Sequence, residues 1–186
     1  MINYNNLAKS IDFYEESGFK RIEAPWLVPP CIDSITKPKD KRHYMLQHND
    51  KCLVASGEQS FLYLYLKENL PLGKFQTITP CFRDERYDLY HEKYFIKNEL
   101  INTENVDKFH LEEMIETAMN FYRTIVPNRE NLEVRETEIG FDIEYFDKRD
   151  FAVELGSYGI RECEFLKWIY GTGCAEPRLS KVCEYK

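Results

Sequence analysis

The sequence lacks the features of several large protein classes. No apolar run approaches the roughly 18 residues that a membrane-spanning helix needs, and the opening MINYNNLAKS has no apolar signal-peptide segment. The net charge is −7, whereas proteins that bind nucleic acid through their overall field are usually basic. We therefore expect a cytoplasmic protein with no membrane partner. Any RNA contact would need a local basic patch, such as Lys37, Lys39, Lys41 and Arg42. The alternative is that these residues form a solvated basic loop.

Paired cysteine motifs are also missing. None of the six cysteines belongs to a C-x-x-C pair. In a reducing compartment this spacing favours free thiols, several of them buried. A zinc site built from distant cysteines with histidine or glutamate stays open, but no ligand spacing indicates one.

Two common nucleotide-binding signatures are absent or incomplete. The P-loop pattern G-x-x-x-x-G-K-[ST] does not occur. Gly171-Thr172-Gly173 begins like a dinucleotide-binding fingerprint, but Glu176 stands where the third glycine belongs. A Rossmann site is therefore not expected.

What is present is a sequence typical of one globular domain. The 186 residues are 43% hydrophobic and 15% aromatic, which argues against disorder and fits a single domain over 1–186. Hydrophobic periodicity and turn residues predict the elements. Helices are expected at 5–17, from the turn 56–58 to 66, from a cap at Asn105 to 125, and from about 176 onward. Strands are expected at 19–28, 52–55, 75–82, 94–101, 132–135, 139–146, 151–155 and 168–175, with a loop at 31–50.

This order of elements predicts the fold class. Several links between strands have hairpin length, and strands do not alternate strictly with helices. We therefore predict an α+β fold with a mainly antiparallel sheet flanked by helices.

The segment 82–99, FRDERYDLYHEKYFIKNE, contains the strongest chemical signal. It reads as two strands joined by a charged loop. Because residues two apart share a face of a strand, Phe95, Lys97 and Glu99 point together, as do Arg83 and Glu85. Arginine binds phosphate oxygens in a bidentate fork, and an aromatic ring offers a base a stacking face. Taken alone, an arginine and a phenylalanine on a hairpin are more often a salt-bridge residue and a core residue than a nucleotide site.

The pattern F-R-x-E, charged loop, H-x-x-x-F-x-x-x-E closely resembles motif 2 of class II aminoacyl-tRNA synthetases. Gly18-Phe19-x-x-Ile22-x-x-Pro25-Trp26-Leu27 looks like motif 1, the dimer-interface element of that family. Gly171-x-Gly173-x-Ala175-x-x-Arg178-Leu179 looks like motif 3. The three motifs stand in the family's order and cover nearly the whole chain. The resemblance implies a class II synthetase or biotinyl-ligase-like core and a homodimer formed through motif 1.

The resemblance also implies residue roles. Arg83 would bind the ATP α-phosphate and the substrate carboxylate, and Arg178 would reach the γ-phosphate from the other side of the adenine. Phe95 would stack on adenine, Glu85 would contact the adenine or its neighbouring backbone, and His91 would steady the β- and γ-phosphates. Glu154 and Ser157 would bind Mg²⁺ and ATP. Glu58 or Glu99 would bind the amino group of the substrate.

Three of these positions also have plain structural interpretations. Glu58 could simply be an acidic residue at the start of a helix, where the helix dipole favours a negative charge. Glu154 would be an ordinary outward-facing strand residue, and Phe95 would be a core residue.

The implied reaction is attack of a carboxylate on the ATP α-phosphorus, releasing pyrophosphate and leaving an acyl-adenylate. The acceptor would be a tRNA or another molecule. The sequence departs from full synthetases in its acidic charge, in Ala175 at the third motif 3 glycine, and in ending eight residues after Arg178. From the length of the sequence we expect no anticodon-binding domain. The competing hypothesis is a non-catalytic, ATP- or amino-acid-binding regulatory relative of a synthetase.

Overall fold

The computed structural model describes residues 1–37, 41–84, 88–147 and 151–184. Its helices are α1 (Tyr4–Glu16), α2 (Pro30–Thr36), α3 (Gly57–Glu68), α4 (Lys108–Ile125) and α5 (Arg178–Glu184), with a 3-10 turn at Arg129–Asn131. Its strands are β1 (Lys20–Arg21), β2 (Leu27–Val28), β3 (Tyr44–Met45), β4 (Cys52–Leu53), β5 (Lys74–Phe82), β6 (Tyr94–Asn102), β7 (Leu132–Thr137), β8 (Gly140–Phe146), β9 (Ala152–Cys163) and β10 (Leu166–Glu176).

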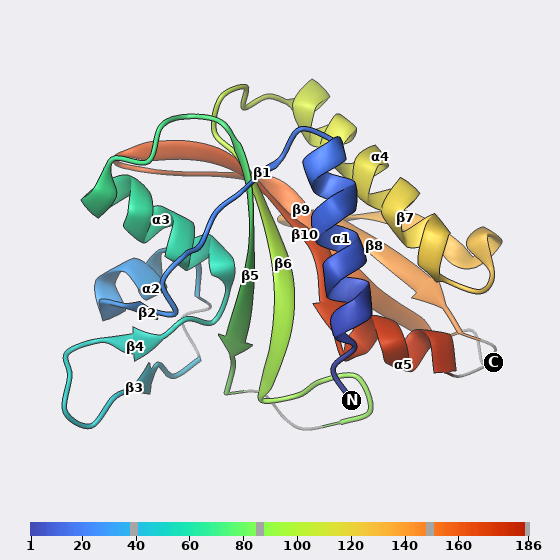
Figure 1. Ribbon diagram of the computed structural model, residues 1–186, viewed down its shortest axis with the longest axis horizontal. Coiled ribbons are helices and arrows are strands. Elements are labelled where there is room, and N and C mark those ends of the chain that lie inside the picture. Colours follow the sequence, from blue (N-terminus) through green and yellow to red (C-terminus); the bar gives the residue numbers. More distant parts are fainter. Residues whose placement is uncertain (38–40, 85–87, 148–150, 185–186) are drawn as a thin grey trace.

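A seven-stranded sheet organises the fold, in the order β1-β5-β6-β10-β9-β8-β7 (Figure 1). All its pairings are antiparallel except that of the short edge strand β1 with β5. A small second sheet has the order β2-β4-β3. The predicted α+β class with a mainly antiparallel sheet is confirmed.

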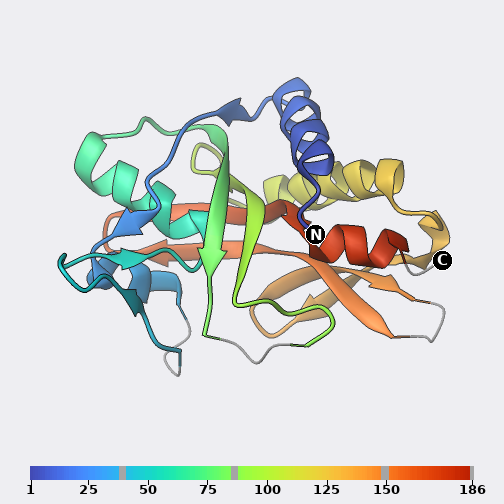
Figure 2. The same cartoon turned by 60° about the horizontal axis from the view of Figure 1, so that its bottom comes forward.

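Each face of the large sheet packs against its own hydrophobic cluster. Helices α1, α4 and α5 cover one face, and the small sheet with α2 and α3 lies beside the other (Figure 2). Neighbouring residues alternate between the clusters, as strand geometry requires. Leu100 belongs to the first cluster and Ile101 to the second, and Ile169 and Trp168 divide in the same way. Two-sided burial makes β6 and β10 the central strands of the molecule.

The glycines of β10 allow α1 and α4 to approach this strand closely. A Cβ atom on Gly171 would lie 2.6 Å from Met114 Sδ of α4, and one on Gly173 would lie 2.7 Å from the Tyr14 ring of α1. Tyr14 also donates a hydrogen bond from its hydroxyl to the Gly173 carbonyl at 3.0 Å. The G-x-G pattern therefore has a packing reason that is independent of any ligand.

The helix boundaries follow local capping signals, with one correction. Asn3 caps α1, Gly18 ends it with a φ of 89°, and Ser56 caps α3 with Gln59 completing a capping box. Asp107, and not the predicted Asn105, caps α4, because the Asp107 side chain accepts a hydrogen bond from the His110 N–H.

Two predictions for the chain before the hairpin were wrong. Residues 19–28 form two short strands in different sheets and not one strand. Residues 31–50 include most of α2 and all of β3, where a loop was predicted. Pro30 begins α2 because its fixed φ suits the first turn of a helix. Strand β9 also continues to Cys163, eight residues beyond the predicted end. No helix within the described residues is both long and apolar enough to cross a membrane.

Candidate active site

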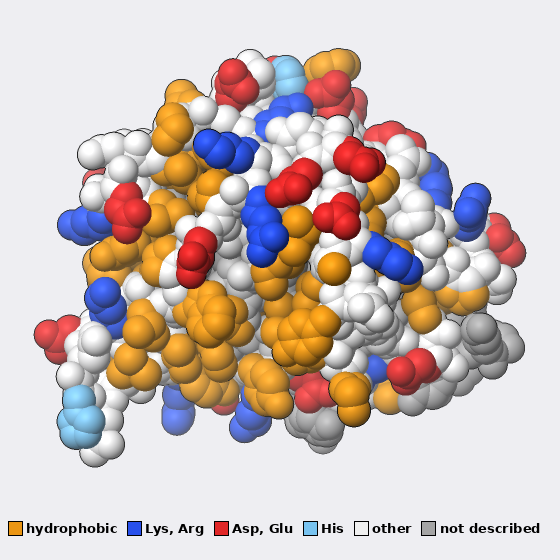
Figure 3. All heavy atoms as spheres, viewed as in Figure 1, with side chains coloured by type: hydrophobic (Ala, Val, Ile, Leu, Met, Phe, Trp, Pro, Cys, Tyr) orange, Lys and Arg blue, Asp and Glu red, His pale blue; other side chains and the backbone are white. Residues whose placement is uncertain are grey.

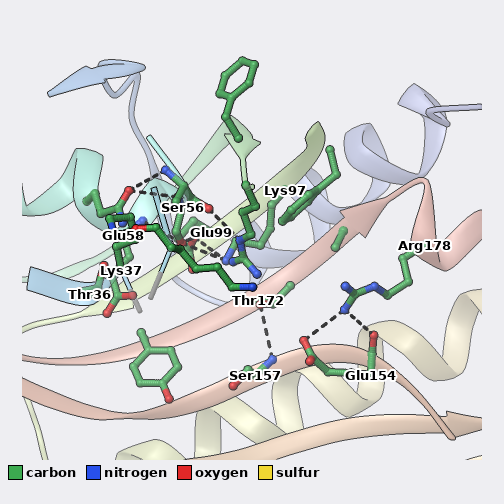
Figure 4. Close-up of a pocket in the computed structure, with 18 of the residues that line it drawn as sticks. Thr36, Lys37, Ser56, Glu58, Lys97, Glu99, Glu154, Ser157, Thr172 and Arg178 are labelled. Atoms are coloured by element: carbon green, nitrogen blue, oxygen red, sulfur yellow. Dashed lines mark hydrogen bonds and ion pairs between the residues drawn. The ribbon is translucent and has the colours of Figure 1, made fainter. Parts of the chain in front are cut away.

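A cavity of about 220 Å³ opens between α3 and the face of the large sheet formed by β5, β6, β10 and β9 (Figure 4). Of the residues singled out from the sequence, Arg83, Phe95, Glu99, Glu58, Glu154, Ser157 and Arg178 line it. Pairing of β5 with β6 sets Thr79 opposite Lys97 and Thr77 opposite Glu99. The three side chains Phe95, Lys97 and Glu99 therefore share the cavity face, as their spacing predicts.

Glu58 lies at the buried end of the cavity. Its side chain, on the first turn of α3, is 3% exposed. Arg161 Nη1 donates to Glu58 Oε2 at 2.5 Å, and Trp168 Nε1 donates to Glu58 Oε1 at 2.6 Å. Burial raises the pKa of the Glu58 carboxyl, and the positive charge of Arg161 opposes that rise. The carboxylate is thus part of a long-range contact and is more than a residue facing a helix dipole.

A second carboxylate at the buried end has its own partners. Glu99 is 1% exposed, and its Oε2 lies 2.7 Å from Lys97 Nζ. Ser56 Oγ donates to the same oxygen at 2.5 Å and accepts from Lys97 Nζ at 3.1 Å. Together with the Glu58–Arg161 pair, this gives two buried carboxylates and two cations whose charges balance.

Arg161 and Trp168 were not singled out from the sequence. Arg161 lies four residues after Ser157 on β9, and Trp168 lies four residues before Thr172 on β10, so each shares a strand face with a cavity residue. Period-two spacing could have found Arg161 only if β9 had been extended past residue 155. The Arg161 guanidinium also lies 4.0 Å from the Tyr170 ring centroid, a cation–π contact.

Arg83 and Phe95 form the middle of the cavity. The Arg83 guanidinium carbon is 5.0 Å from the Phe95 ring centroid, and Arg83 Nε donates to the Ala55 carbonyl at 3.1 Å. Tyr44 of β3 donates its hydroxyl to the Arg83 carbonyl at 3.1 Å. Phe95 is therefore a cavity residue beneath a cation and not solely core. Glu85, the other predicted residue of this strand end, lies outside the described residues.

The exposed end of the cavity holds an ion pair between two predicted residues. Arg178 Nη1 donates to the Glu154 backbone carbonyl at 2.9 Å and lies 3.2 Å from Glu154 Oε1, as Figure 4 shows. The Glu154 side chain is 47% exposed and that of Arg178 is 16% exposed. Both residues also line a neighbouring cavity of about 630 Å³ between the hairpin loop and β8–β9.

Carboxylates cluster beside Glu154. Antiparallel pairing of β8 with β9 sets Asp142 opposite Ser157 and Glu144 opposite Glu154. Burial raises the pKa of Asp142, the nearby Glu154 charge raises it further, and a hydrogen bond from Ser157 opposes both effects. Sequence reasoning missed Asp142 and Glu144, because only strand register reveals their position.

His91 lies apart from the main cavity. It lines a smaller neighbouring pocket with Phe95 and Arg178. Its Nδ1 is 2.8 Å from Asp88 Oδ2 within the hairpin loop. Backbone N–H groups of Tyr90 and His91 lower the pKa of Asp88 to about 2, since they stabilise its charged form.

The basic segment contributes to the cavity wall. Lys37, Lys41 and Arg42 line it, and Lys39 lies outside the described residues. Lys37 Nζ donates to the Lys41 carbonyl. These cations are therefore not simply a solvated loop, and they give the cavity positive charge beyond that of Arg83 and Arg178.

The comparisons with known proteins identify the fold. No family model matches the chain, and no curated protein sequence matches it. Among solved structures, seryl-tRNA synthetase from Pyrococcus horikoshii complexed with ATP superposes with a TM-score of 0.76 at 14% identity, over 94% of this chain and 48% of that one. Cytoplasmic serine-tRNA ligase from Naegleria fowleri in complex with AMP gives 0.71 at 20% identity, over 96% and 47%. Pyrrolysyl-tRNA synthetase from Desulfitobacterium hafniense gives 0.72 at 17% identity, over 97% and 69%.

The chain therefore has the fold of class II aminoacyl-tRNA synthetase catalytic cores, as its motifs predict. It spans about half the length of the two serine enzymes that it matches.

Proposed function

We propose that this chain binds ATP in the cavity and uses it to activate an amino acid, or a similar carboxylic acid, as an acyl-adenylate with release of pyrophosphate. The observation that carries the proposal is the convergence of Arg83, Phe95 and Arg178 on one cavity whose buried end holds carboxylates. Two guanidiniums and a ring are the groups that phosphates and a purine require.

The two ends of the cavity suit the two substrates. A substrate carboxylate is already charged, so its attack on phosphorus needs no general base; it needs alignment and neutralisation of charge. Arg83 would hold the carboxylate against the α-phosphate, and Phe95 would stack on the adenine. Glu58 or Glu99 would accept the substrate ammonium, whose charge would add to that of the Arg161 and Lys97 cations already present.

Magnesium is the cofactor that ATP chemistry in this fold implies, and the donor set fits it. The Glu154 carboxylate and the Ser157 hydroxyl line the cavity, with Asp142 beside them, and hard oxygen donors suit this cation. Burial raises the pKa of Asp142 and the Glu154 charge raises it further, so a cation bound here would favour the charged form of Asp142. Bound Mg²⁺ would supply neutralisation of phosphate charge, while Arg83 and Arg178 hold the phosphate oxygens.

Binding of ATP would require one local exchange at the exposed end. Arg178 contacts Glu154 in the free protein. For both residues to serve ATP, the phosphates must replace Glu154 as the partner of Arg178. An exposed ion pair contributes only about 0–1 kcal/mol, so this exchange has a small cost. His91, in the hairpin loop, lines two neighbouring pockets together with Arg178 and would steady the outer phosphates from there.

The same ion pair favours the second candidate function. If Arg178 stays bound to Glu154, the exposed end has no arginine for the γ-phosphate, and the chain becomes a non-catalytic nucleotide- or amino-acid-binding accessory protein. A tRNA or a carrier acceptor belongs to the first candidate only.

We also propose a homodimer formed through the motif 1 region. Trp26, between β1 and β2, is 55% exposed, and Met45 of β3 is 53% exposed. Figure 3 shows hydrophobic side chains gathered over the part of the surface where Figure 1 has the small sheet and the lower ends of β5 and β6. A second copy is the occupant that the motif implies. Light scattering of the purified chain tests this, and a stable monomer would refute it.

Pyrophosphate exchange into ATP, measured with each of the 20 amino acids, separates the two functions. We expect exchange with one or a few amino acids, and a loss of at least about 100-fold in Arg83→Ala, because a preorganised donor is removed from the reacting phosphate. Arg129→Ala, on an exposed 3-10 turn, is the matched control and should keep full activity. Binding of ATP or an amino acid by calorimetry without any exchange would establish the accessory function instead.

A further inference from the structure

Three residues capable of binding a metal converge behind the wall of the cavity. Asp33 lies on α2, His43 directly precedes β3, and Cys52 begins β4. One ligand atom from each lies within 4.8 Å of the others. None of the three belongs to the motifs that define the cavity, and none lines it.

An ion pair explains only part of this group. Asp33 Oδ2 lies 2.5 Å from His43 Nδ1. The Asp33 side chain is 1% exposed, and its other oxygen, Oδ1, has no hydrogen-bond partner among the described residues. Cys52 is fully buried, and its Sγ donates a weak hydrogen bond to the Val28 carbonyl at 3.4 Å. A buried, unpartnered carboxylate oxygen beside a buried thiol is an unusual combination, because buried acceptors normally have a partner.

The chemistry of the three donor groups points to one class of metal ion. A thiolate, an imidazole and a carboxylate are the protein ligands of zinc, whereas calcium and magnesium take oxygen donors alone. Ligand atoms on a tetrahedral zinc lie about 3.3–3.8 Å apart, so closing the group on an ion requires movements of about 1 Å. His43 is only partly buried, at 26% exposed, and has room to move.

We propose that Asp33, His43 and Cys52 bind a zinc ion whose fourth ligand is water. The surroundings supply the support that such ligands need. Ser34 Oγ lies 3.4 Å from His43 Nε2 and can fix the ring through the nitrogen that does not bind the metal. Gln59 of α3 donates to the Asp33 backbone carbonyl at 3.2 Å and holds that turn of α2.

The site would fix the basic segment of the cavity wall at both ends. Thr36 and Lys37, at the end of α2, line the cavity, and so do Lys41 and Arg42, directly before His43. The proposed ion joins Asp33 of α2 to Cys52 of β4 and to His43, and so would add to the Asp33–His43 contact that already holds two of these residues together. This role is structural and holds whether the chain is a ligase or an accessory protein.

Measuring the zinc content of the purified protein tests the proposal directly and needs no activity assay. Purified protein is incubated with zinc, separated from excess by gel filtration and measured by inductively coupled plasma mass spectrometry. We expect one zinc per chain. In Cys52→Ser and in His43→Gln, zinc should bind at least about 100-fold more weakly, since losing a ligand costs at least as much as losing a residue that orients one.

The matched control is Cys81→Ser, because Cys81 is also fully buried and its thiol also faces a backbone carbonyl, that of Thr79 at 3.8 Å. It should keep the zinc. His43→Gln changes a partly exposed ring, so it stays informative even where Cys52→Ser fails to fold.

Cobalt substitution identifies the ligand atom. Cobalt bound at this site should give a thiolate-to-metal charge-transfer band in the near ultraviolet, absent from Cys52→Ser and present in Cys81→Ser. Wild-type protein that retains no zinc, zinc retained equally by the His43→Gln variant, or a cobalt complex without the thiolate band would each overturn the proposal and leave an Asp33–His43 ion pair alone.

Discussion

The two ends of the cavity are built in opposite ways. At the buried end, Glu58 is 3% exposed and accepts hydrogen bonds from Arg161 of β9 and Trp168 of β10. At the exposed end, Arg178 meets Glu154, which is 47% exposed. The buried end is a network of several partners, and the exposed end is one pair of residues of which Glu154 is open to water.

This difference assigns each end a different task. Buried charges pay a desolvation cost, so they persist only with fixed partners, and those partners hold the cavity in one shape. An exposed pair is weak and screened by salt, so a ligand can replace one of its members. Under the proposed function, the buried end would be the preorganised amino-acid pocket, and the exposed end would be the place where charged phosphates enter.

The largest expected effect concerns the buried end. Arg161→Met should lower the free energy of unfolding by about 3 kcal/mol at pH 8, because it leaves the Glu58 carboxylate buried without its counter-charge. The Glu58 pKa is already raised by burial, and losing Arg161 raises it further. A raised folded-state pKa gives stability that is present below the unfolded value of 4.5 and is lost as the pH rises through the folded-state value. The destabilisation should therefore be smaller at pH 5 than at pH 8.

Urea unfolding of both proteins at pH 5 and pH 8 measures this. Arg178→Met is the matched control at the exposed end, where the partner stays solvated. The free energy of unfolding of Arg178→Met should fall by less than about 1 kcal/mol at both pH values. Equal losses in the two variants would remove the contrast between the two ends.

An intermediate effect is expected for nucleotide binding. Arg178→Met should weaken MgATP binding about tenfold, or about 1.4 kcal/mol, because it removes a charge-assisted contact to a phosphate. Calorimetry at low salt measures the affinity, with Arg129→Met on the exposed 3-10 turn as the control. An unchanged affinity would mean that Arg178 serves only its contact with Glu154, as the accessory-protein hypothesis requires.

The smallest effect has a sign that depends on magnesium. Glu154→Gln removes the negative charge that pairs with Arg178, so ATP in the presence of a chelator should bind about threefold more tightly, which is within the energy of an exposed ion pair. With Mg²⁺ present, the variant should bind ATP more weakly than the wild type, since it loses a carboxylate ligand. Glu162→Gln, exposed on the same strand β9, should change neither affinity. If the ATP affinity of the variant changed in the same direction under both conditions, Glu154 would not be a ligand of the metal.

Local signals predicted most of the elements that build the site. Alternation along β6 predicted that Phe95, Lys97 and Glu99 share a face, and they do. Ser56 and the turn that begins α3 follow from capping chemistry. The errors at 19–28 and 31–50 arose where short elements depend on neighbours from elsewhere in the chain, since two-residue strands have almost no periodicity of their own.

The sequence by itself determined the fold class and the hairpin with Arg83 and Phe95, because alternation, capping and motif spacing are properties of nearby residues. Only the tertiary structure decided which charges meet. Trp168 reaches Glu58 across 110 residues, Arg178 contacts Glu154, and Asp33, His43 and Cys52 come together from three elements. Such pairings depend on strand register and on packing over the sheet, which no local pattern encodes.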